Sequence, residues 1–554
     1  MLPSASHPFA PRATRRGFLA AALASGLASG SLSLRAATAV PRADDERTFE
    51  LDELTLTDLQ AGMQSGKWTA RGLAEKYLAR IEAIDRRGPH LNSVIEVNPD
   101  ALALAEQLDK ERKEKGTRGP LHGIPILIKD NIDTADKMAT TAGSLALVGS
   151  RPKKDAFLVT QLRGAGALIL GKTNLSEWAN ARSTSSTSGW SGRGGLTKNP
   201  YALDRNPSGS SSGSGVAVAA NLCAAAIGTE TDGSILSPAS TNGIVGLKPT
   251  IGLVSRTGVI PISHTQDTAG PMTRTVKDAA LLLTALAGID REDKISPSSG
   301  DQGAKDYAPF LKEDGLKGAR IGVARNYFGF HPGVETVMVN ALKALKDQGA
   351  ILIETTELPK SDQFSSAELT VFEYEMKAGV NAYLAKLGDR APVKTLKEVI
   401  DFNKTHATQE LPYFGQELLI RMQAKGSLES YEYIEALAKC RRLSRTEGID
   451  PVMEKHHLDA IIAPGCGPAC VTDLLLGDRG AGGDIISIAA VAGYPSITVP
   501  AGDFYGLPIG LCFIGKPWSE PKLLQLAYGF EQATKARRPP RFLPTADLGK
   551  PSQS

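Results

Sequence analysis

The stretch "NPSGSSSGSG", Asn206–Gly215, lies in the middle of the chain and has an unusual composition. Runs of glycine and serine are most often flexible linkers. This run also contains the pattern G-x-S-x-G, through Gly209, Ser211 and Gly213, which is typical of the nucleophile elbow of α/β-hydrolases. The segments around it decide which interpretation holds, and they also decide the fold.

A nucleophile elbow requires a hydrophobic strand directly before the serine, but "YALDRNP" precedes Gly209 and is polar and turn-forming. The best candidate for the histidine that would pair with an elbow serine is His264 in "HTQD", but a lone histidine is usually structural. A linker is disfavoured because the next segment, "SGVAVAANLCAAAIGTETDGS", is expected to be a small-residue helix that runs into a second glycine turn. Ser211 is therefore not predicted to be an elbow nucleophile.

Helix and strand patterns alternate on both sides of this stretch up to about residue 290. "GIPILIKDNID" predicts a buried strand that ends at Lys129, and "DAFLVTQLRGAGALILGKTN" predicts a helix, a turn and a buried strand over 167–170. A helix is expected from the N-cap Thr69, with one apolar face made by Leu73, Tyr77, Ile81 and Ile84. This alternation favours an α/β sheet core.

Residues from about 300 to 450 are more charged and are expected to be helical, as in "SYEYIEALAKCRRLSR". Strand-like runs return in "LDAIIAPG", "SITVPAG" and "GLPIGLCFIG". Such an order predicts one domain over residues 40–554, with a core at about 120–290 and a helical insertion at about 300–450.

"GALILGKT", Gly166–Thr173, matches the phosphate-binding pattern G-x-x-x-x-G-K-[ST] letter for letter. A phosphate loop needs exposed backbone N–H groups between a strand and a helix. The four middle residues, Ala-Leu-Ile-Leu, are instead expected to form the strand itself. We predict that the match is coincidental and that Lys172 is a strand-end residue.

The first 39 residues predict an export signal. "TRRGFLAAALASGLASGSLSL" places Arg15 and Arg16 before a short apolar run, and "ATA" at 37–39 is a small-residue cleavage pattern. The paired arginines resemble a twin-arginine signal. A transmembrane helix would be longer and richer in large apolar residues, so we expect a removed leader, no stable membrane insertion, and a periplasmic or secreted protein.

Removing residues 1–39 deletes four of the 63 basic residues and no acidic one, which leaves 59 basic against 60 acidic residues. This balance gives no electrostatic reason to expect a nucleic-acid partner. The histidines and cysteines have no metal-ligand spacing, so neither a metal nor a cofactor is predicted. Cys466 and Cys470 are expected to be small buried residues, with a disulfide as the alternative.

Two further features indicate chemistry. Lys129 ends a buried apolar strand, and Ser234 follows Gly233 in "TETDGSIL". Serine becomes a good nucleophile only when a base takes its proton, and burial can keep a lysine neutral so that it acts as that base. A glycine-containing turn can supply backbone N–H donors to an oxyanion. The alternative is a surface lysine and two turn-forming serines, and the combination of features favours the catalytic interpretation.

With these residues in view, the chain resembles the amidase signature family, hydrolases with a Ser-cisSer-Lys triad. The resemblance rests on "NPSGSSSGSGVAVAANLCAAAIGTETDGSILSPASTNGIVGLKPTIGLVSRTGVIP", and extends upstream through "LHGIPILIKDNID" and "GALILGKTNLSEWAN" and downstream through "AAVAGYPSITVPAG". It implies an α/β/α sandwich with a large mixed central sheet covered by helices.

The resemblance also implies roles for individual residues. Lys129 is the base, Ser210 the bridging serine with a cis peptide bond, and Ser234 the nucleophile. The implied oxyanion donors are the backbone N–H groups of Thr231, Asp232, Gly233 and Ser234. The implied supporting residues of the loop are Gly209, Ser211 and Gly213. The chain departs from the common pattern at Ser208, Ser212 and Asp232, which replace glycines, and at Leu236, where many members carry arginine.

Within the family the chain is most similar to bacterial peptide amidases, which implies hydrolysis of C-terminal peptide amides to the free acid and ammonia. Aryl, aliphatic or fatty acyl amides are the alternative substrates, because specificity resides in loops that the signature does not fix. A glutamyl-tRNA amidotransferase A-type subunit is disfavoured by the predicted export. A non-enzymatic binding protein is disfavoured because all three triad residues are present. The oligomeric state is not predicted.

Overall fold

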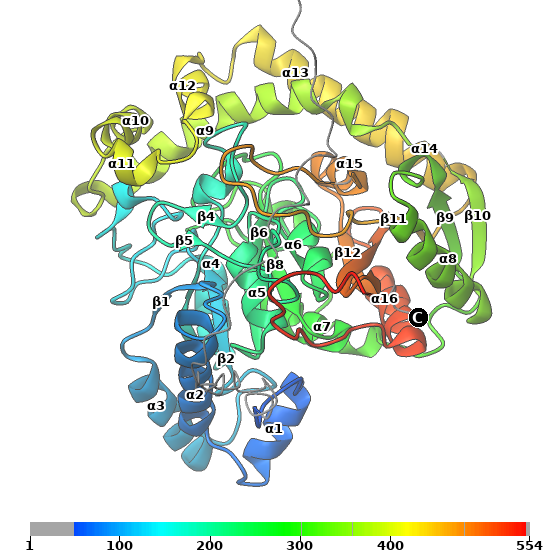
Figure 1. Cartoon of the computed structure of the whole chain (residues 1–554), viewed down its shortest axis with the longest axis horizontal. Coiled ribbons are helices and arrows are strands. Elements are labelled where there is room, and N and C mark those ends of the chain that lie inside the picture. The colour runs from blue at the N-terminus through cyan, green and yellow to red at the C-terminus, as the bar shows by residue number, and fades with distance from the viewer. Residues whose placement is uncertain (1–48, 301, 357, 481, 550–554) are drawn as a thin grey trace, which may run out of the picture. The chain divides into compact units, whose positions relative to one another are not determined.

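The computed structural model describes residues 49–549 except 301, 357 and 481, and the predicted leader, 1–39, lies outside them (Figure 1). The described residues from Glu50 onward form one compact unit. Its main sheet is built from the strands β1 Val94–Val97, β2 Pro125–Lys129, β3 Leu168–Thr173, β6 Ala225–Glu230, β7 Val245–Lys248, β8 Thr268–Thr273, β9 Arg320–Ala324, β10 Ile351–Thr356, β11 Ala460–Pro464, β12 Ser496–Phe504 and β13 Leu507–Ile514. A small hairpin is formed by β4 Trp190–Ser191 and β5 Gly195–Leu196.

Helices surround this sheet in the described part of the chain. They are α1 Leu56–Gln64, α2 Ala70–Arg80, α3 Ala101–Lys115, α4 Phe157–Gly164, α5 Ser212–Ala219, α6 Leu236–Thr241, α7 Val276–Leu286, α8 Pro332–Asp347, α9 Ser365–Leu387, α10 Leu396–Thr405, α11 Ala407–Glu410, α12 Glu417–Ala424, α13 Tyr431–Arg441, α14 Asp450–Lys455, α15 Ile485–Ala492 and α16 Glu520–Thr534. None of these helices is both long and apolar enough to cross a bilayer.

The eleven strands follow the order β1-β3-β2-β6-β8-β7-β12-β13-β11-β9-β10. The sheet is mixed: β2 pairs in parallel with β3 and β6, whereas β8 is antiparallel to β6 and β7. The central strands are buried along their whole length, as expected for a sheet covered on both faces. The predicted mixed sheet with covering helices is thus confirmed.

The strand order divides the sheet into two halves at the β7–β12 junction. The first six strands in the order all precede residue 274, and the other five all follow residue 319. The two halves join through antiparallel pairing, in which Ser496 of β12 lies opposite Lys248 of β7. Each half of the sheet therefore comes from one continuous part of the sequence.

The predicted helix after Thr69 is confirmed as α2. The Thr69 side chain accepts a hydrogen bond from the Gly72 N–H, as an N-cap should. Leu73 and Tyr77 of the predicted apolar face lie on α2, whereas Ile81 and Ile84 lie on the π-helical segment Ile81–Arg86 that continues it, and all four are buried.

The strand β3 is longer than the predicted 167–170 and runs to Thr173, so the phosphate-loop match is a strand, as predicted. Lys172 is the last residue but one of β3, as a strand-end residue should be, and its buried ammonium donates to the Ile132 carbonyl and to Thr140 Oγ1. The helix predicted to run directly into the second glycine turn is shorter than expected. It is α5, which ends at Ala219, and the unpredicted strand β6 lies between it and the turn. Alanine-rich "CAAAIG" is ambiguous between the two structures because all its residues are buried.

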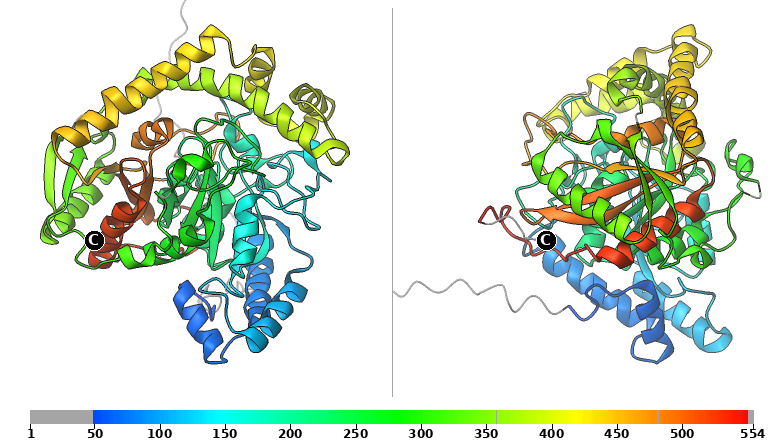
Figure 2. Two further views of the ribbon diagram at one scale, coloured as in Figure 1. Left: turned by 180° about the vertical axis from the view of Figure 1, so that it is seen from behind. Right: turned by 90° about the vertical axis from the view of Figure 1, so that its right-hand side faces the viewer.

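The predicted helical insertion at about 300–450 was too wide, because β9, α8 and β10 within it belong to the main sheet and its cover. Short parallel strands with partners distant in sequence carry little local signal. The segment outside the sheet is 365–455, from α9 to α14, and we call it the helical arm. Figures 1 and 2 show α9 and α13 running side by side as an arch beside the sheet.

Candidate active site

The Lys129 side chain is fully buried at the carboxyl end of β2. Its Nζ lies 2.8 Å from Ser210 Oγ, 3.0 Å from Ser211 Oγ and 2.9 Å from Thr229 Oγ1. It also donates to the Thr229 carbonyl at 3.2 Å. The structure thus brings three of the predicted site residues together, because Lys129 contacts both Ser210 and Ser211.

Burial lowers the pKa of Lys129 to about 7, because the apolar surroundings penalise the ammonium form. The negative charges of Glu230 and Asp267 oppose this fall. A lysine with such a pKa is substantially neutral at neutral pH, so it can accept a proton. Thr229 and Glu230, on the neighbouring strand β6, were not predicted to belong to the site, although they lie in the quoted signature.

The peptide bond between Gly209 and Ser210 is cis, as the family resemblance implied. The Ser210 carbonyl accepts a hydrogen bond from the Ser176 N–H at 3.1 Å. A Cβ atom on Gly209 would lie 2.3 Å from Ser176 Oγ, so no side chain fits there. Ser176, which the sequence did not mark, thus forms the wall behind the bridging serine.

The supporting residues of the loop fix its other side. Ser211 is fully buried, and its hydroxyl donates to the Thr229 carbonyl at 3.0 Å and accepts from the Thr229 N–H. A Cβ atom on Gly213 would lie 2.4 Å from the carbonyl oxygens of both Ser93 and Asn174. The quoted glycine–serine stretch is therefore a packed loop that leads into α5, in agreement with the rejection of a linker.

Ser234 lies at the turn between β6 and α6, and its residue is 8% exposed. Its carbonyl accepts from the Ser211 N–H at 3.2 Å, which ties the two serine loops together. Within the described residues no group forms a hydrogen bond with the Ser234 hydroxyl. The two loops are therefore joined through the Ser211 N–H and the Ser234 carbonyl, and the hydroxyls of Ser210 and Ser234 are not hydrogen-bonded to each other.

The turn that carries Ser234 is held from inside by Glu230. One carboxylate oxygen accepts the N–H groups of Ile235 at 2.7 Å and Leu236 at 3.0 Å. Burial raises the pKa of Glu230, and the charge of the equally buried Lys248 opposes the rise. Gly233 adopts φ +76°, a conformation that glycine permits at this turn.

The predicted oxyanion residues are also held from outside. Thr231 Oγ1 donates to Asp267 at 2.6 Å, and the Thr231 carbonyl accepts from Gln266 Nε2 at 3.2 Å. Asp232 accepts from Ser487 Oγ at 3.0 Å. Burial, reinforced by the charge of Glu230, raises the pKa of Asp232 to about 7.

The helical arm reaches this outer layer through buried acids on α9. Glu368 accepts from Gln266 Nε2 at 2.8 Å, so one amide links the arm to the Thr231 carbonyl. Glu375 accepts from Ser263 Oγ at 2.6 Å and from the Thr265 N–H at 3.1 Å. No sequence motif marked these two acids, since their partners lie about a hundred residues away.

Cys466 and Cys470 are free thiols and are partly exposed, which corrects the expectation of buried residues. Among residues 49–549, with the three gaps, no cluster of histidine, cysteine, aspartate or glutamate could hold a metal ion. His264 is a half-exposed residue whose Nδ1 lies 3.4 Å from Glu375, and within the described part of the chain it forms no hydrogen bond with Ser210 or Ser234.

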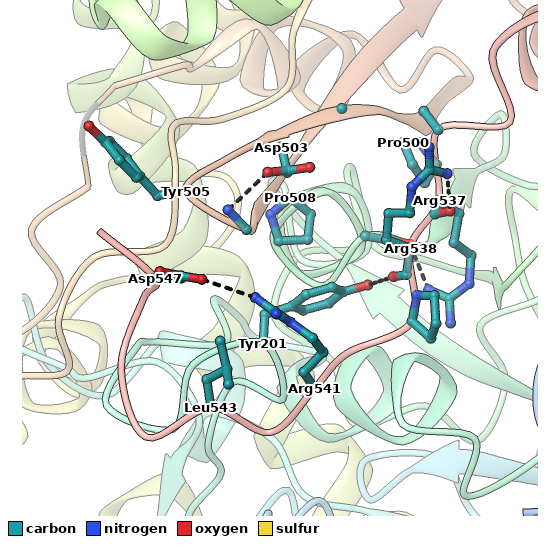
Figure 3. A pocket seen from close by; sticks show the side chains of 15 residues that line it. Tyr201, Pro500, Asp503, Tyr505, Pro508, Arg537, Arg538, Arg541, Leu543 and Asp547 are labelled. Carbon is teal, nitrogen blue, oxygen red and sulfur yellow. Dashed lines mark hydrogen bonds and ion pairs between the residues drawn. The ribbon is translucent and has the colours of Figure 1, made fainter. Parts of the chain in front are cut away.

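A cavity of about 540 Å³ lies between the β12–β13 turn and the segment 536–547 (Figure 3). None of the predicted site residues lines it. Several of its polar side chains already have partners, since Tyr201 donates to the Arg538 carbonyl and Arg541 lies 3.6 Å from Asp547. This cavity is therefore not the candidate active site.

Comparison with known proteins gives a consistent result. The family model described as Amidase matches residues 72–524. The solved structure of peptide amidase from Stenotrophomonas maltophilia is 51% identical, with a TM-score of 0.85, and the match covers 89% of this chain and 100% of that chain. A probable amidase of Arabidopsis thaliana is 44% identical over 507 residues, 90% of this chain and 93% of the relative.

A third relative comes from a different activity class. The A-type subunit of the glutamyl-tRNA(Gln) amidotransferase of Chloroflexus aurantiacus is 36% identical over 498 residues. The match covers 88% of this chain and 98% of that relative.

Proposed function

The chain belongs to the amidase family and is a hydrolase of amide C–N bonds, and on this premise we propose that it removes C-terminal amides from peptides, releasing the free acid and ammonia. The observation that carries the proposal is the buried Lys129, with its Nζ 2.8 Å from Ser210 Oγ. A neutral lysine in contact with the bridging serine is the base that a serine nucleophile requires.

In the proposed acylation step, Ser234 Oγ attacks the amide carbonyl carbon while its proton passes to Ser210 Oγ. The Ser210 proton passes at the same time to Lys129 Nζ. The carbonyl oxygen becomes an oxyanion beside the backbone N–H groups of residues 231–234, which stabilise the negative charge.

Collapse of the tetrahedral intermediate breaks the C–N bond. The proton on Lys129 returns through Ser210 to the leaving nitrogen, so that ammonia departs and Ser234 carries the acyl group as an ester. Water then attacks this ester and gives a proton to Ser210, while Ser210 passes its own proton to Lys129. Breakage of the ester C–O bond releases the acid, and the proton on Lys129 returns through Ser210 to the Ser234 oxygen, which restores its hydroxyl.

Similarity supports the peptide-amide substrate, because the peptide amidase of S. maltophilia is matched over its whole length. Amidases of aryl, aliphatic or fatty acyl amides keep the same triad and are the second candidate. The amidotransferase alternative is favoured only by the 36% identity to proteins of that class. The expected partner is therefore a small or peptide amide, with no nucleic acid.

Mass spectrometry of an N-blocked, C-terminally amidated peptide tests the proposal. We expect loss of the terminal amide with all internal bonds intact, and no change with Ser234→Ala. Hydrolysis of an anilide or fatty amide in place of the peptide amide would retain the triad and reject the peptide substrate. Full activity in Ser234→Ala would reject the nucleophile.

We also propose that the enzyme is exported by the twin-arginine route, which the pattern at Arg15 and Arg16 supports. Cell fractionation of the full chain, with Arg15→Lys/Arg16→Lys as the matched variant, tests this. We expect the processed protein outside the cytoplasm only when both arginines are present. Equal export of the variant would contradict the proposal.

A further inference from the structure

A buried arginine, Arg182, contacts Glu177, the residue that follows Ser176. The Arg182 side chain is fully buried between two aromatic rings, with its guanidinium carbon 4.9 Å from the centroid of Trp190 and 4.3 Å from that of Phe414. Its Nη1 lies 2.9 Å from Glu177 Oε1 and 3.6 Å from Glu410 Oε2. It also donates to the Glu410 carbonyl.

The two acids of this cluster are buried as completely as the arginine. Burial raises the pKa of Glu177 well above its ordinary value, with Arg182 opposing the rise and Glu410 adding to it. Two carboxyl groups and one guanidinium in a dry site are most stable with one proton retained, which leaves the cluster neutral. Removal of the guanidinium would therefore leave a buried carboxylate without its counter-ion.

One side of the cluster connects to the catalytic loop. Glu177 follows Ser176, whose N–H donates to the Ser210 carbonyl at 3.1 Å. The second Glu177 oxygen accepts from the Gly192 N–H at 2.6 Å, and Ser176 Oγ accepts from the Gly189 N–H at 3.0 Å. Because Gly209 leaves no space beside Ser176 Oγ, a shift of the Ser176 backbone moves the Gly209–Ser210 peptide.

The other side connects to the helical arm. Glu410 ends α11, and its Oε1 accepts from the Leu145 N–H at 2.6 Å. Glu417 of α12 accepts from Ser183 Oγ at 2.8 Å and from the Thr184 N–H at 2.6 Å, directly after Arg182. The segment 176–184 is thus held between the arm and the bridging serine.

We propose that Arg182, with Glu177 and Glu410, is a positioning residue through which the helical arm holds Ser176 against Ser210 and so aligns the Lys129–Ser210 contact. This inference rests on the proposed relay through Ser210, and it assigns Arg182 no contact with substrate. It predicts that loss of the guanidinium impairs proton transfer to Lys129 while the nucleophile itself remains present.

The test measures the rate at which a small fluorophosphonate modifies Ser234, as a function of pH, in Arg182→Met, Arg182→Lys and the control Arg537→Met. Arg537 is also a largely buried arginine, with its Nη2 2.7 Å from Glu53, but it contacts neither serine loop. The probe requires an activated Ser234 and no knowledge of the natural amide. Failure of the peptide-amide proposal and failure of this inference are therefore separable.

We expect Arg182→Met to lower the labelling rate at least about tenfold, because small misplacements of catalytic groups have large effects on rate. The pH midpoint should move below that of the wild type, because the Lys129 ammonium loses an acceptor while the charges of Glu230 and Asp267 remain. Arg182→Lys should recover part of the rate, and Arg537→Met should label like the wild type.

A purely structural role would lower the labelled fraction or the melting temperature and leave the rate constant and midpoint of the folded protein unchanged. That result in Arg182→Met would overturn the proposal. If Arg182→Met does not fold, Arg182→Lys decides, since it keeps the charge and loses the planar contacts with Trp190 and Phe414. A wild-type rate and midpoint in folded Arg182→Lys would then overturn it.

Discussion

The signature core and the helical arm contribute to the candidate site in different ways. The core supplies the proposed reacting groups, Lys129, Ser210 and Ser234, from strand ends and tight loops within about a hundred residues of sequence. The arm supplies none of them. Its contribution is a set of polar side chains that hold the loops of the core, namely the buried Glu368, Glu375 and Glu410 and the partly buried Tyr383.

This difference separates the two demands that a serine hydrolase places on its fold. The base must be kept out of water so that it stays neutral, which the sheet achieves by burying Lys129. The oxyanion donors and the bridging serine must be kept in place, which requires hydrogen bonds to loops. Changes in the core should therefore abolish chemistry, whereas changes in the arm should lower stability and alignment.

The largest effect is expected for Lys129→Met. The fold should survive, because a buried lysine is replaced by an apolar side chain of similar length. The kcat on an amide substrate should fall on the order of 10³-fold, the range typical for loss of a general base. Steady-state kinetics and circular dichroism check this result, and turnover within a few-fold of the wild type would remove Lys129 from the proposed relay.

The pH dependence of kcat/KM tests whether the core supplies Lys129 as the base. Because burial lowers the pKa of Lys129 to about 7, its ammonium form prevails below that pH and cannot act as a base. We expect kcat/KM to rise roughly tenfold per pH unit up to about pH 7 and then to level off. A profile that is flat between pH 5 and 7 would contradict a lysine base.

A smaller effect is expected in the arm for Glu375→Gln. The carboxylate accepts hydrogen bonds from Ser263, Thr265 and Tyr433 in a buried site. Replacing it should cost about 1–3 kcal/mol of unfolding free energy, measured by urea denaturation. Glu435→Gln, at an exposed position on α13, is the matched control and should be neutral. Equal stability of the two variants would show that the arm acids do not hold the loops.

The smallest effect is expected for Tyr383→Phe. The Tyr383 hydroxyl donates to Asp133 at 2.7 Å, four residues after the lysine base. Removal of the hydroxyl should lower the free energy of unfolding by about 1 kcal/mol and leave kcat within a few-fold of the wild type. Denaturation and kinetics on one preparation check both values. A loss of kcat as large as that of Lys129→Met would break the division between core and arm.

The parts of the fold and of the site that could be predicted are those with a signal in contiguous sequence. A run of apolar residues that ends in Lys129 is a local signal for a buried strand, and the glycine–serine loop and the turn at Ser234 are likewise contiguous in sequence. The full length of β3 was not predicted, because the sequence does not show that Lys172 has buried hydrogen-bond partners. The strand β6 was not predicted, because alanines suit a buried helix and a buried strand equally.

The positioning residues were not predictable for a different reason. Glu368 meets Gln266 across 102 residues, and Glu410 meets Leu145 across 265 residues. A single acid on a helix gives no local sign that it is buried. Only the placement of the arm relative to the core loops makes such residues recognisable.

The division of the sheet at the β7–β12 junction has a consequence for how the protein is made. Every strand of the first half, together with Lys129, Ser210 and Ser234, leaves the ribosome before the second half is synthesised. The N-terminal part of a nascent chain folds first when it can. We therefore expect a nascent chain that carries the three proposed reacting groups, and that gains activity only when residues 365–455 and then Ser487 emerge and engage its loops.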